Sequence, residues 1–91
     1  MNKYKKKLVL VQRILKLAVE ITNNTKVDVF VHYSGHVDYI QCHVYLQGWN
    51  DDTSGNPDYR SDLFYSLHTE EESNKQLEET IKYLEEIRGK Y

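Results

Sequence analysis

Three stretches of the chain alternate between apolar and polar residues, the pattern of β-strands that bury one face. The longest stretch covers residues 37–49, and two shorter ones cover residues 25–33 and 59–68. Because neighbouring residues of a strand point to opposite faces, the central stretch is predicted to turn Ile40, Cys42, Val44 and Leu46 toward the core. The inward side chains predicted for the flanking strands are Val27, Val29, Val31, Tyr33, Leu63, Tyr65 and Leu67.

Apolar residues at helical spacing precede the strands, from Lys3 to about Asn23. They form two adjoining stripes, which merge into an apolar arc roughly 200° wide. A sheet alone does not need so wide an arc, so we expect this helix to lie between the sheet and either a second helix or a partner subunit. The stripes are Leu8, Val11, Leu15 and Ala18, and Leu10, Ile14, Leu17 and Ile21. Val9 is the one large apolar residue predicted on the opposite, polar side.

A second helix is predicted to begin after Thr69, because Thr69 and Glu72 have the spacing of a capping box. The helix is expected to end near Gly89. Its narrow apolar stripe consists of Leu77, Ile81, Leu84 and Ile87 or Tyr91. Glu71/Lys75, Glu78/Lys82 and Glu86/Lys90 are spaced as ion pairs along it.

Turn residues separate the strands and set the expected topology. Ser34 and Gly35 predict a hairpin between the first two strands, and residues 50–58 (NDDTSGNPD) predict a loop before the third. A four-residue turn over residues 34–37 would place His32 opposite Tyr39. We therefore predict one α+β domain over residues 1–91, in the order α-β-β-β-α, with a three-stranded antiparallel sheet and both helices packed on one face.

Composition narrows the classes of partner. The chain has 12 Lys and Arg against 14 Asp and Glu, a net charge of −2, which gives no reason to expect non-specific binding to nucleic acid or membranes. No apolar run approaches the roughly twenty residues of a membrane-spanning helix, and no secretory signal is recognisable, so we expect a cytoplasmic protein. The acidic residues concentrate in the C-terminal half. These acidic residues either form ion pairs with the basic N-terminal half or imitate the phosphate backbone of a nucleic acid.

The side chains predicted to face away from the helices are strongly aromatic. A contiguous aromatic patch on an uncovered sheet face is typical of an interface, although aromatic residues also stabilise strands through cross-strand pairs. We expect Tyr45 and Trp49, with Phe64 beside them, to be exposed and to form its centre. The predicted interface residues are Phe30, His32, Tyr39, His43, Tyr45, Trp49, Arg60 and Phe64.

The sequence contains no recognisable catalytic, cofactor or metal motif. Cys42 has the inward parity, where a thiol behaves as a small hydrophobic group, and a single cysteine excludes an intrachain disulfide. His32 and His68 are predicted on the two outer strands, about 10 Å apart, whereas zinc ligands lie about 2.1 Å from their ion. No glycine-rich phosphate-binding motif occurs. We therefore expect a protein that is not an enzyme and holds no metal or cofactor.

The predicted order of elements is also that of double-stranded-RNA-binding domains. Those domains grip phosphates with a lysine-rich start to their second helix. Glu70, Glu71 and Glu72 occupy that position here and would repel RNA. We therefore expect a protein partner, with nucleic-acid binding as a less favoured alternative.

Residues 27–49 (VDVFVHYSGHVDYIQCHVYLQGW) and 81–87 (IKYLEEI) resemble small, uncharacterised proteins encoded by prophages and mobile elements of Gram-positive bacteria. The resemblance covers about a third of the chain and carries no functional motif. It implies an accessory protein that binds a host or phage protein, such as an anti-CRISPR-like inhibitor of a host defence system. The alternative is a structural homo-oligomer, such as a homodimer, joined through the aromatic sheet face.

Overall fold

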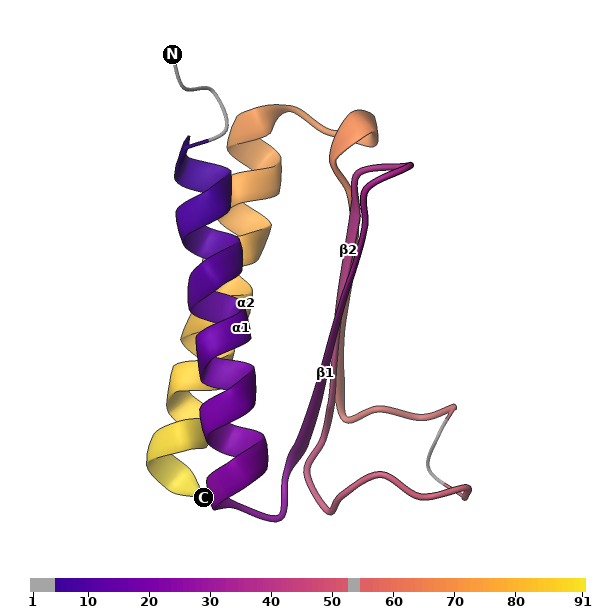
Figure 1. Cartoon of the computed structure of the whole chain (residues 1–91), viewed down its shortest axis with the longest axis vertical. Helices are drawn as coiled ribbons and strands as arrows, with labels where there is room; N and C mark the ends of the chain where they lie inside the picture. The colour runs from indigo at the N-terminus through magenta and orange to yellow at the C-terminus, as the bar shows by residue number, and fades with distance from the viewer. Residues whose placement is uncertain (1–4, 53–54) are drawn as a thin grey trace.

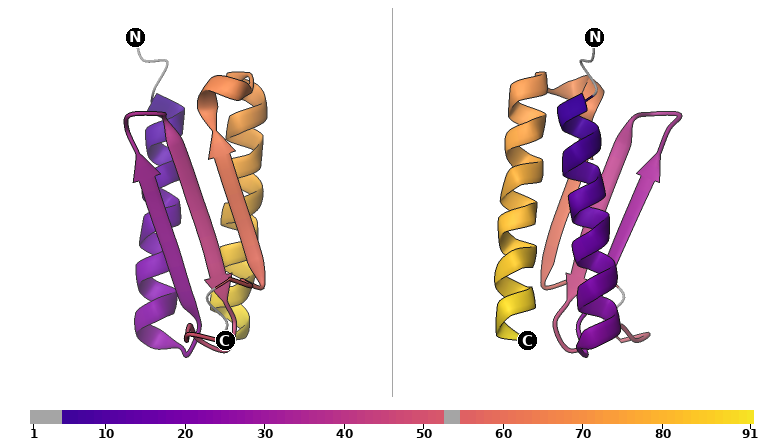
Figure 2. Two further views of the ribbon diagram at one scale, coloured as in Figure 1. Left: turned by 90° about the vertical axis from the view of Figure 1, so that its right-hand side faces the viewer. Right: turned by 60° about the vertical axis from the view of Figure 1, so that its left-hand side comes forward.

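The structure is a computed structural model and describes residues 5–52 and 55–91. Its elements are α1 (Lys5–Asn24), β1 (Asp28–Ser34), β2 (Tyr39–Tyr45), β3 (Tyr59–Phe64), a 3-10 turn η1 (Tyr65–Leu67) and α2 (Glu70–Lys90). The strands form an antiparallel sheet in the order β1-β2-β3, and both helices pack on one face of it (Figures 1 and 2). The predicted α+β fold is confirmed. None of the helices described is long and apolar enough to cross a membrane.

The core lies between the sheet and the two helices. Ile40, Cys42 and Val44 supply its middle from β2, as predicted, and each is at most 2% exposed. Burial raises the pKa of the Cys42 thiol to about 12, which keeps it in the unreactive protonated form. The buried side chains that surround this row are Ile14, Leu17, Ile21, Val27, Leu63, Leu77, Leu84 and Ile87.

Thr69 caps α2 through the predicted capping box. The Glu72 backbone N–H donates to Thr69 Oγ1 over 3.1 Å, and the Thr69 backbone N–H donates to Glu72 Oε1 over 3.0 Å. The two bonds satisfy donors that the first turn of a helix otherwise leaves unpaired. The helix continues one residue past Gly89, to Lys90.

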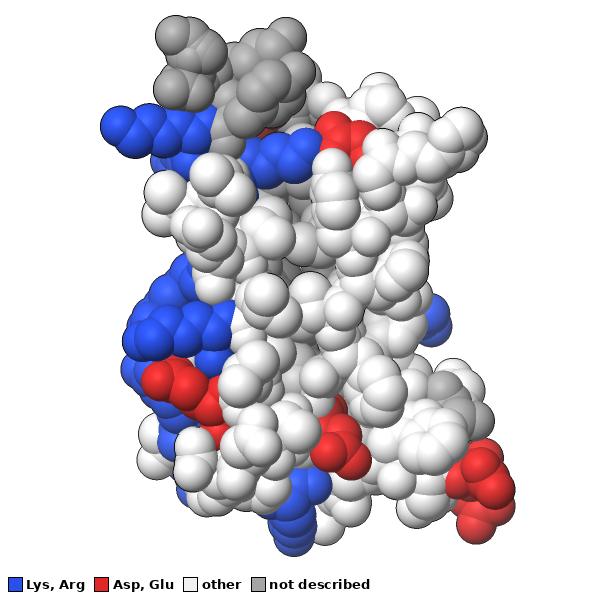
Figure 3. Space-filling model, viewed as in Figure 1, with Lys and Arg blue, Asp and Glu red and all other residues white. Residues whose placement is uncertain are grey.

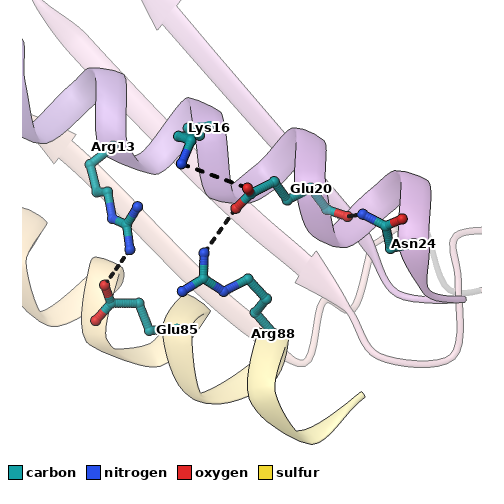
Figure 4. Close-up of polar contacts among 6 residues, drawn as sticks. All are labelled: Arg13, Lys16, Glu20, Asn24, Glu85 and Arg88. Atoms are coloured by element: carbon teal, nitrogen blue, oxygen red, sulfur yellow. Dashed lines mark hydrogen bonds and ion pairs between the residues drawn. The ribbon is translucent and has the colours of Figure 1, made fainter.

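Charged side chains of α2 form ion pairs with side chains of α1 rather than with one another. The pairs between the helices are Lys6–Glu78 at 3.3 Å, Arg13–Glu85 at 2.7 Å and Arg88–Glu20 at 2.9 Å. Figure 4 shows the last two, with Lys16 also reaching Glu20 from one turn earlier in α1. The predicted pairs Glu71/Lys75, Glu78/Lys82 and Glu86/Lys90 form no ion pair in the described parts of the chain. Glutamates of α2 therefore pair with basic side chains of α1.

The β1–β2 hairpin differs in register from the prediction. Ser34 pairs with Tyr39 and His32 pairs with Gln41, because the turn occupies residues 35–38 instead of 34–37. Asp38 makes this possible by adopting a positive φ of 49°, which acidic residues tolerate better than most. The observed and predicted registers differ by two residues, an even number. Each side chain of the two strands therefore keeps its predicted face of the sheet.

The third strand ends at Phe64 instead of continuing to His68. Phe64 pairs with Tyr39, the first residue of β2, so the residues beyond it have no strand to pair with. The backbone turns into η1, where the Tyr65 N–H donates to the Asp38 carbonyl over 3.1 Å. As a result Leu67, predicted to face inward, is 73% exposed, and Tyr65 is only half-buried.

Only part of the apolar arc of α1 is covered. Ile14, Leu17 and Ile21 are fully buried against the sheet and α2. Leu8 and Leu15 belong to the same predicted arc, yet they are 57% and 53% exposed. The expected second helix therefore covers one side of the arc and leaves the other uncovered. Lys3, where the helix was predicted to begin, lies outside the described residues.

Candidate functional site on the outer sheet face

The predicted interface residues come from the side of the sheet opposite the helices, which we call the outer sheet face (Figure 2). Strand alternation places them there, because each occupies the parity opposite a core residue. The contributing side chains are Phe30 of β1, Tyr39, His43 and Tyr45 of β2, and Arg60 and Phe64 of β3. Trp49 joins them from the loop that follows β2.

Asp62 lies at the centre of the outer sheet face and binds several of its neighbours. Its carboxylate accepts a hydrogen bond from Tyr39 Oη at 2.8 Å, lies 3.0 Å from His43 Nε2, and accepts from Arg60 Nε at 3.0 Å. Partial burial acts to raise the pKa of Asp62, but the bonds from Tyr39 and His43 outweigh it and lower that pKa. Partial burial and the same carboxylate raise the pKa of Tyr39. The network holds a fixed negative charge in the middle of the face.

An aromatic cluster lies at the end of the sheet where β2 finishes. The ring of Phe30 contacts Tyr45 edge to face, with centroids 5.6 Å apart, and contacts Trp49 at 6.4 Å. Phe30 and Trp49 are 48% and 44% exposed, whereas Tyr45 is only 5% exposed. The first two rings are therefore available to a partner, and the third is not.

The expectation that Tyr45 is exposed was wrong, and the reason lies in where β2 ends. The strand was predicted to reach Trp49, but it stops at Tyr45, and Gly48 turns the chain with a φ of +89°. The segment then extends beyond the outer sheet face (Figure 1). A Cβ at Gly48 would lie 3.3 Å from the Lys26 carbonyl oxygen, so the turn requires glycine for space as well as for φ. Phe30 packs against Tyr45, Trp49 packs against Phe30, and neither helix crosses this face.

Two aspartates fix this loop to the sheet. The Trp49 backbone N–H donates to Asp28 Oδ2 over 2.7 Å, and the Leu46 backbone N–H donates to Asp58 Oδ2 over 2.7 Å. Hydrogen bonds to charged acceptors are stronger than neutral ones. The backbone of Trp49 is thus held in place.

A second aromatic pair lies at the opposite end of the face. The rings of Tyr39 and Phe64 are 4.3 Å apart and tilted by 31°, and Phe64 is 39% exposed. The Asp62 network separates this pair from Phe30 and Trp49. The predicted single centre of Tyr45, Trp49 and Phe64 is therefore two aromatic clusters with a polar network between them.

His32 and His68 lie outside the Asp62 network, although His32 shares the outward parity of Phe30. His32 is exposed on the edge strand β1, opposite Gln41, and takes no part in the Asp62 network. His68 follows η1 and so lies beyond the end of β3. Within residues 5–52 and 55–91, no three His, Cys, Asp or Glu side chains are grouped closely enough to hold a metal ion.

Asp62 is the central residue of the outer sheet face that the predicted interface set left out. Its signal in the sequence was a carboxylate inside a strand pattern, two residues from Arg60. Its role depends on Gln41 lying directly opposite, which places Tyr39 and His43 on either side. That register becomes apparent only when the end of β3 is known.

Comparison with known proteins yields no relative. No protein-family model matches the chain, no curated protein is significantly similar to it in sequence, and no solved structure is significantly similar to its fold.

Proposed function

We propose that this protein is a non-enzymatic protein-binding module and that the outer sheet face is its binding surface. One observation carries the proposal: Phe30, Trp49 and Phe64 are 48%, 44% and 39% exposed on a sheet face that no helix covers. Aromatic side chains are enriched at protein interfaces and depleted on surfaces that serve only solubility.

The arrangement suits recognition because its parts are already ordered. Phe30 and Phe64 stand on paired strands, and the backbone of Trp49 is bound to Asp28. Binding then costs little additional side-chain entropy, which is one of the main costs of association. Arg60 and Asp62 provide a polar centre that a partner must match, and this gives the surface specificity as well as area.

The class of partner follows from the resemblance to proteins of Gram-positive prophages and mobile elements. Proteins of that kind act on the host or on the phage itself, so the partner is a host or phage protein. Inhibition of a host defence protein needs no chemistry from this chain. It requires only that the outer sheet face occupy a surface that the partner uses.

The experiment compares three tagged proteins in parallel captures from a Gram-positive host lysate: the wild type, the double variant Phe30→Ser/Trp49→Ser, and Val9→Ser. Val9 is the control because it is a large apolar residue, 53% exposed, that lies on α1, away from the outer sheet face. We expect a stoichiometric partner with the wild type and the control, and its loss with the double variant.

The purified partner then allows a direct titration. The double variant should weaken association by at least about thirtyfold, the effect of losing about 2 kcal/mol at an interface hot spot. Circular dichroism of the double variant checks that it remains folded. A partner that binds the folded double variant as tightly as the wild type would rule out the outer sheet face as the binding surface.

A further inference from the structure

A row of exposed apolar side chains runs along α1 on the side nearest β1. Leu8, Leu15 and Val19 are 57%, 53% and 54% exposed, and their spacing places them within one narrow sector of the helix. Val11 adjoins them and is half-buried. We call this row the α1 stripe. It lies beside the buried arc of α1 and remains uncovered by α2.

The free edge of β1 lies next to the α1 stripe. Within the described residues no strand pairs with β1 on the side away from β2. The Val29 backbone N–H donates to Thr22 of α1 over 3.1 Å, so it points away from β2. Strand geometry then points the N–H and C=O groups of Val31 and Tyr33 outward as well. An edge of this kind is a template for another strand.

The α1 stripe and the β1 edge form one continuous surface. Leu15 and Val19 line the same open hollow, of about 240 Å³, as Val29 and Val31. Near the other end, Leu8 and Val11 line a second hollow, of about 590 Å³, with Tyr33. Figure 3 shows the middle of this face without charged side chains, which lie along its margins and at both ends. We call this surface the α1–β1 face.

We propose that the α1–β1 face binds a second copy of this chain, with β1 pairing antiparallel to β1 of the copy about a two-fold axis at Val31. Val31 is the middle residue of β1. A two-fold interface must be complementary to itself, and the proposed pairing of β1 with β1 meets this requirement. The pairs across the axis are Val31 with Val31, Val29 with Tyr33, Phe30 with His32, and Asp28 with Ser34. No two like charges face each other.

The backbone can supply the bonds that this pairing needs. Each Val31 exchanges both of its hydrogen bonds with the Val31 of the copy, and each Tyr33 N–H donates to the Val29 carbonyl opposite. Only the Val29 N–H is already occupied, by Thr22. Because Leu15 lies at the level of Val31, the axis also passes near the middle of the α1 stripe. The two α1 stripes therefore meet on the helix side of a six-stranded sheet.

The available area favours a copy over a short peptide. The α1–β1 face lies on the broad side of the molecule seen in Figure 1; the whole of that side, whose Cα atoms extend 40 Å by 25 Å, is on the order of 1,000 Å². A stable interface of standard size buries about 800 Å² per partner. A single added strand would leave the α1 stripe exposed, whereas a second copy covers both elements.

The test measures the mass of the purified protein by analytical ultracentrifugation. It covers protein concentrations from roughly 1 to 200 μM and compares the wild type with two matched variants. Val19→Glu places a charge in the α1 stripe. Val9→Glu places the same charge on the same helix at a residue of matching exposure, 53%, about 100° around the helix from the middle of the α1 stripe. We expect a dimer with the wild type and with Val9→Glu, and a dissociation constant at least about tenfold higher with Val19→Glu, because a carboxylate would lose its hydration in the interface.

Amide hydrogen exchange provides a second readout that needs no variant. The amides of Val31 and Tyr33 should exchange quickly in dilute protein and become protected as the concentration rises. A wild type that stays monomeric throughout the range would overturn the proposal. A dimer that Val19→Glu leaves intact, or one that Trp49→Ser abolishes, would also overturn it by placing the contact elsewhere. Neither readout requires a host partner, so it is independent of the function proposed for the outer sheet face.

Discussion

The ring of Phe30 meets the ring of Tyr45 edge to face, with the planes at 79° and the centroids 5.6 Å apart. Phe30 is 48% exposed and Tyr45 is 5% exposed. One ring of the pair thus shields the other from water. Neighbouring rings in one cluster therefore have different roles, since Tyr45 stabilises the fold and Phe30 remains available for contact.

Tyr45→Ala should lower the free energy of unfolding by about 3 kcal/mol, because it removes a large buried ring. Trp49→Ala should lower it by only about 1 kcal/mol, because the Trp49 ring is 44% exposed. Urea unfolding followed by circular dichroism measures both. Equal stability of Tyr45→Ala and the wild type would mean that the segment after β2 does not cover the ring.

Cys42 should resist thiol reagents in the folded protein. Burial raises its pKa to about 12, so almost no thiolate exists at neutral pH, and the sheet blocks access. Labelling should become complete on addition of denaturant. Cys42→Ser should destabilise the fold by roughly 1 to 3 kcal/mol, because a buried hydroxyl without a partner loses its hydration. Rapid labelling of the native protein would contradict the core position of Cys42.

The Asp62 network should make stability depend on acid pH. The folded-state pKa of Asp62 lies below its ordinary value of 3.8. The ionised form of the carboxylate is therefore more stable, relative to the protonated form, in the folded state than in the unfolded state. Its contribution is therefore fully present above the unfolded pKa and is lost as the pH falls through the lower, folded pKa. An NMR titration of the Asp62 carboxyl carbon measures this pKa directly.

The same network is tested at neutral pH by Asp62→Asn. The substitution removes the charge that Tyr39, His43 and Arg60 share, and should cost about 1 kcal/mol. Asp52→Asn, in the exposed loop, is the matched control and should stay within about 0.5 kcal/mol of the wild type. Equal effects of the two substitutions would show that the network does not contribute to stability.

The capping box of α2 predicts a graded response at Thr69. Thr69→Ala removes the oxygen that accepts from the Glu72 N–H and should destabilise the protein by about 1 kcal/mol. Thr69→Ser keeps an equivalent oxygen and should change stability by only a few tenths of a kcal/mol. Thermal unfolding of the three proteins compares them. A serine variant as unstable as the alanine variant would assign the effect to the lost methyl group instead.

Much of the fold followed from local patterns in the sequence. Alternation in β2 identified the buried row of Ile40, Cys42 and Val44, because parity does not depend on the register of pairing. The capping box located the start of α2 at Thr69, since both partners of that motif lie within one turn. These features were predictable because the residues that determine them are close in sequence.

The sequence-based predictions were wrong where segments distant in the sequence determine the local structure. Leu67 continued an alternating pattern, but β2 begins at Tyr39 and leaves the residues after Phe64 without a strand to pair with. Tyr45 had the parity of an exposed residue, yet it is 5% exposed where it packs against Phe30 at the end of β2. The Asp62 network likewise required the register of two strands to be known.

The first and last helices of the chain pack against each other, and this constrains the order in which the fold can be completed. α1 emerges first during synthesis, but Leu77, Leu84 and Ile87, which help to enclose the core that α1 enters, belong to the last element. Closing a loop this long costs entropy before those distant contacts repay it. Nascent chains that lack α2 therefore expose the apolar side of the sheet, and we expect the native state to form cooperatively only after the C-terminal helix has left the ribosome.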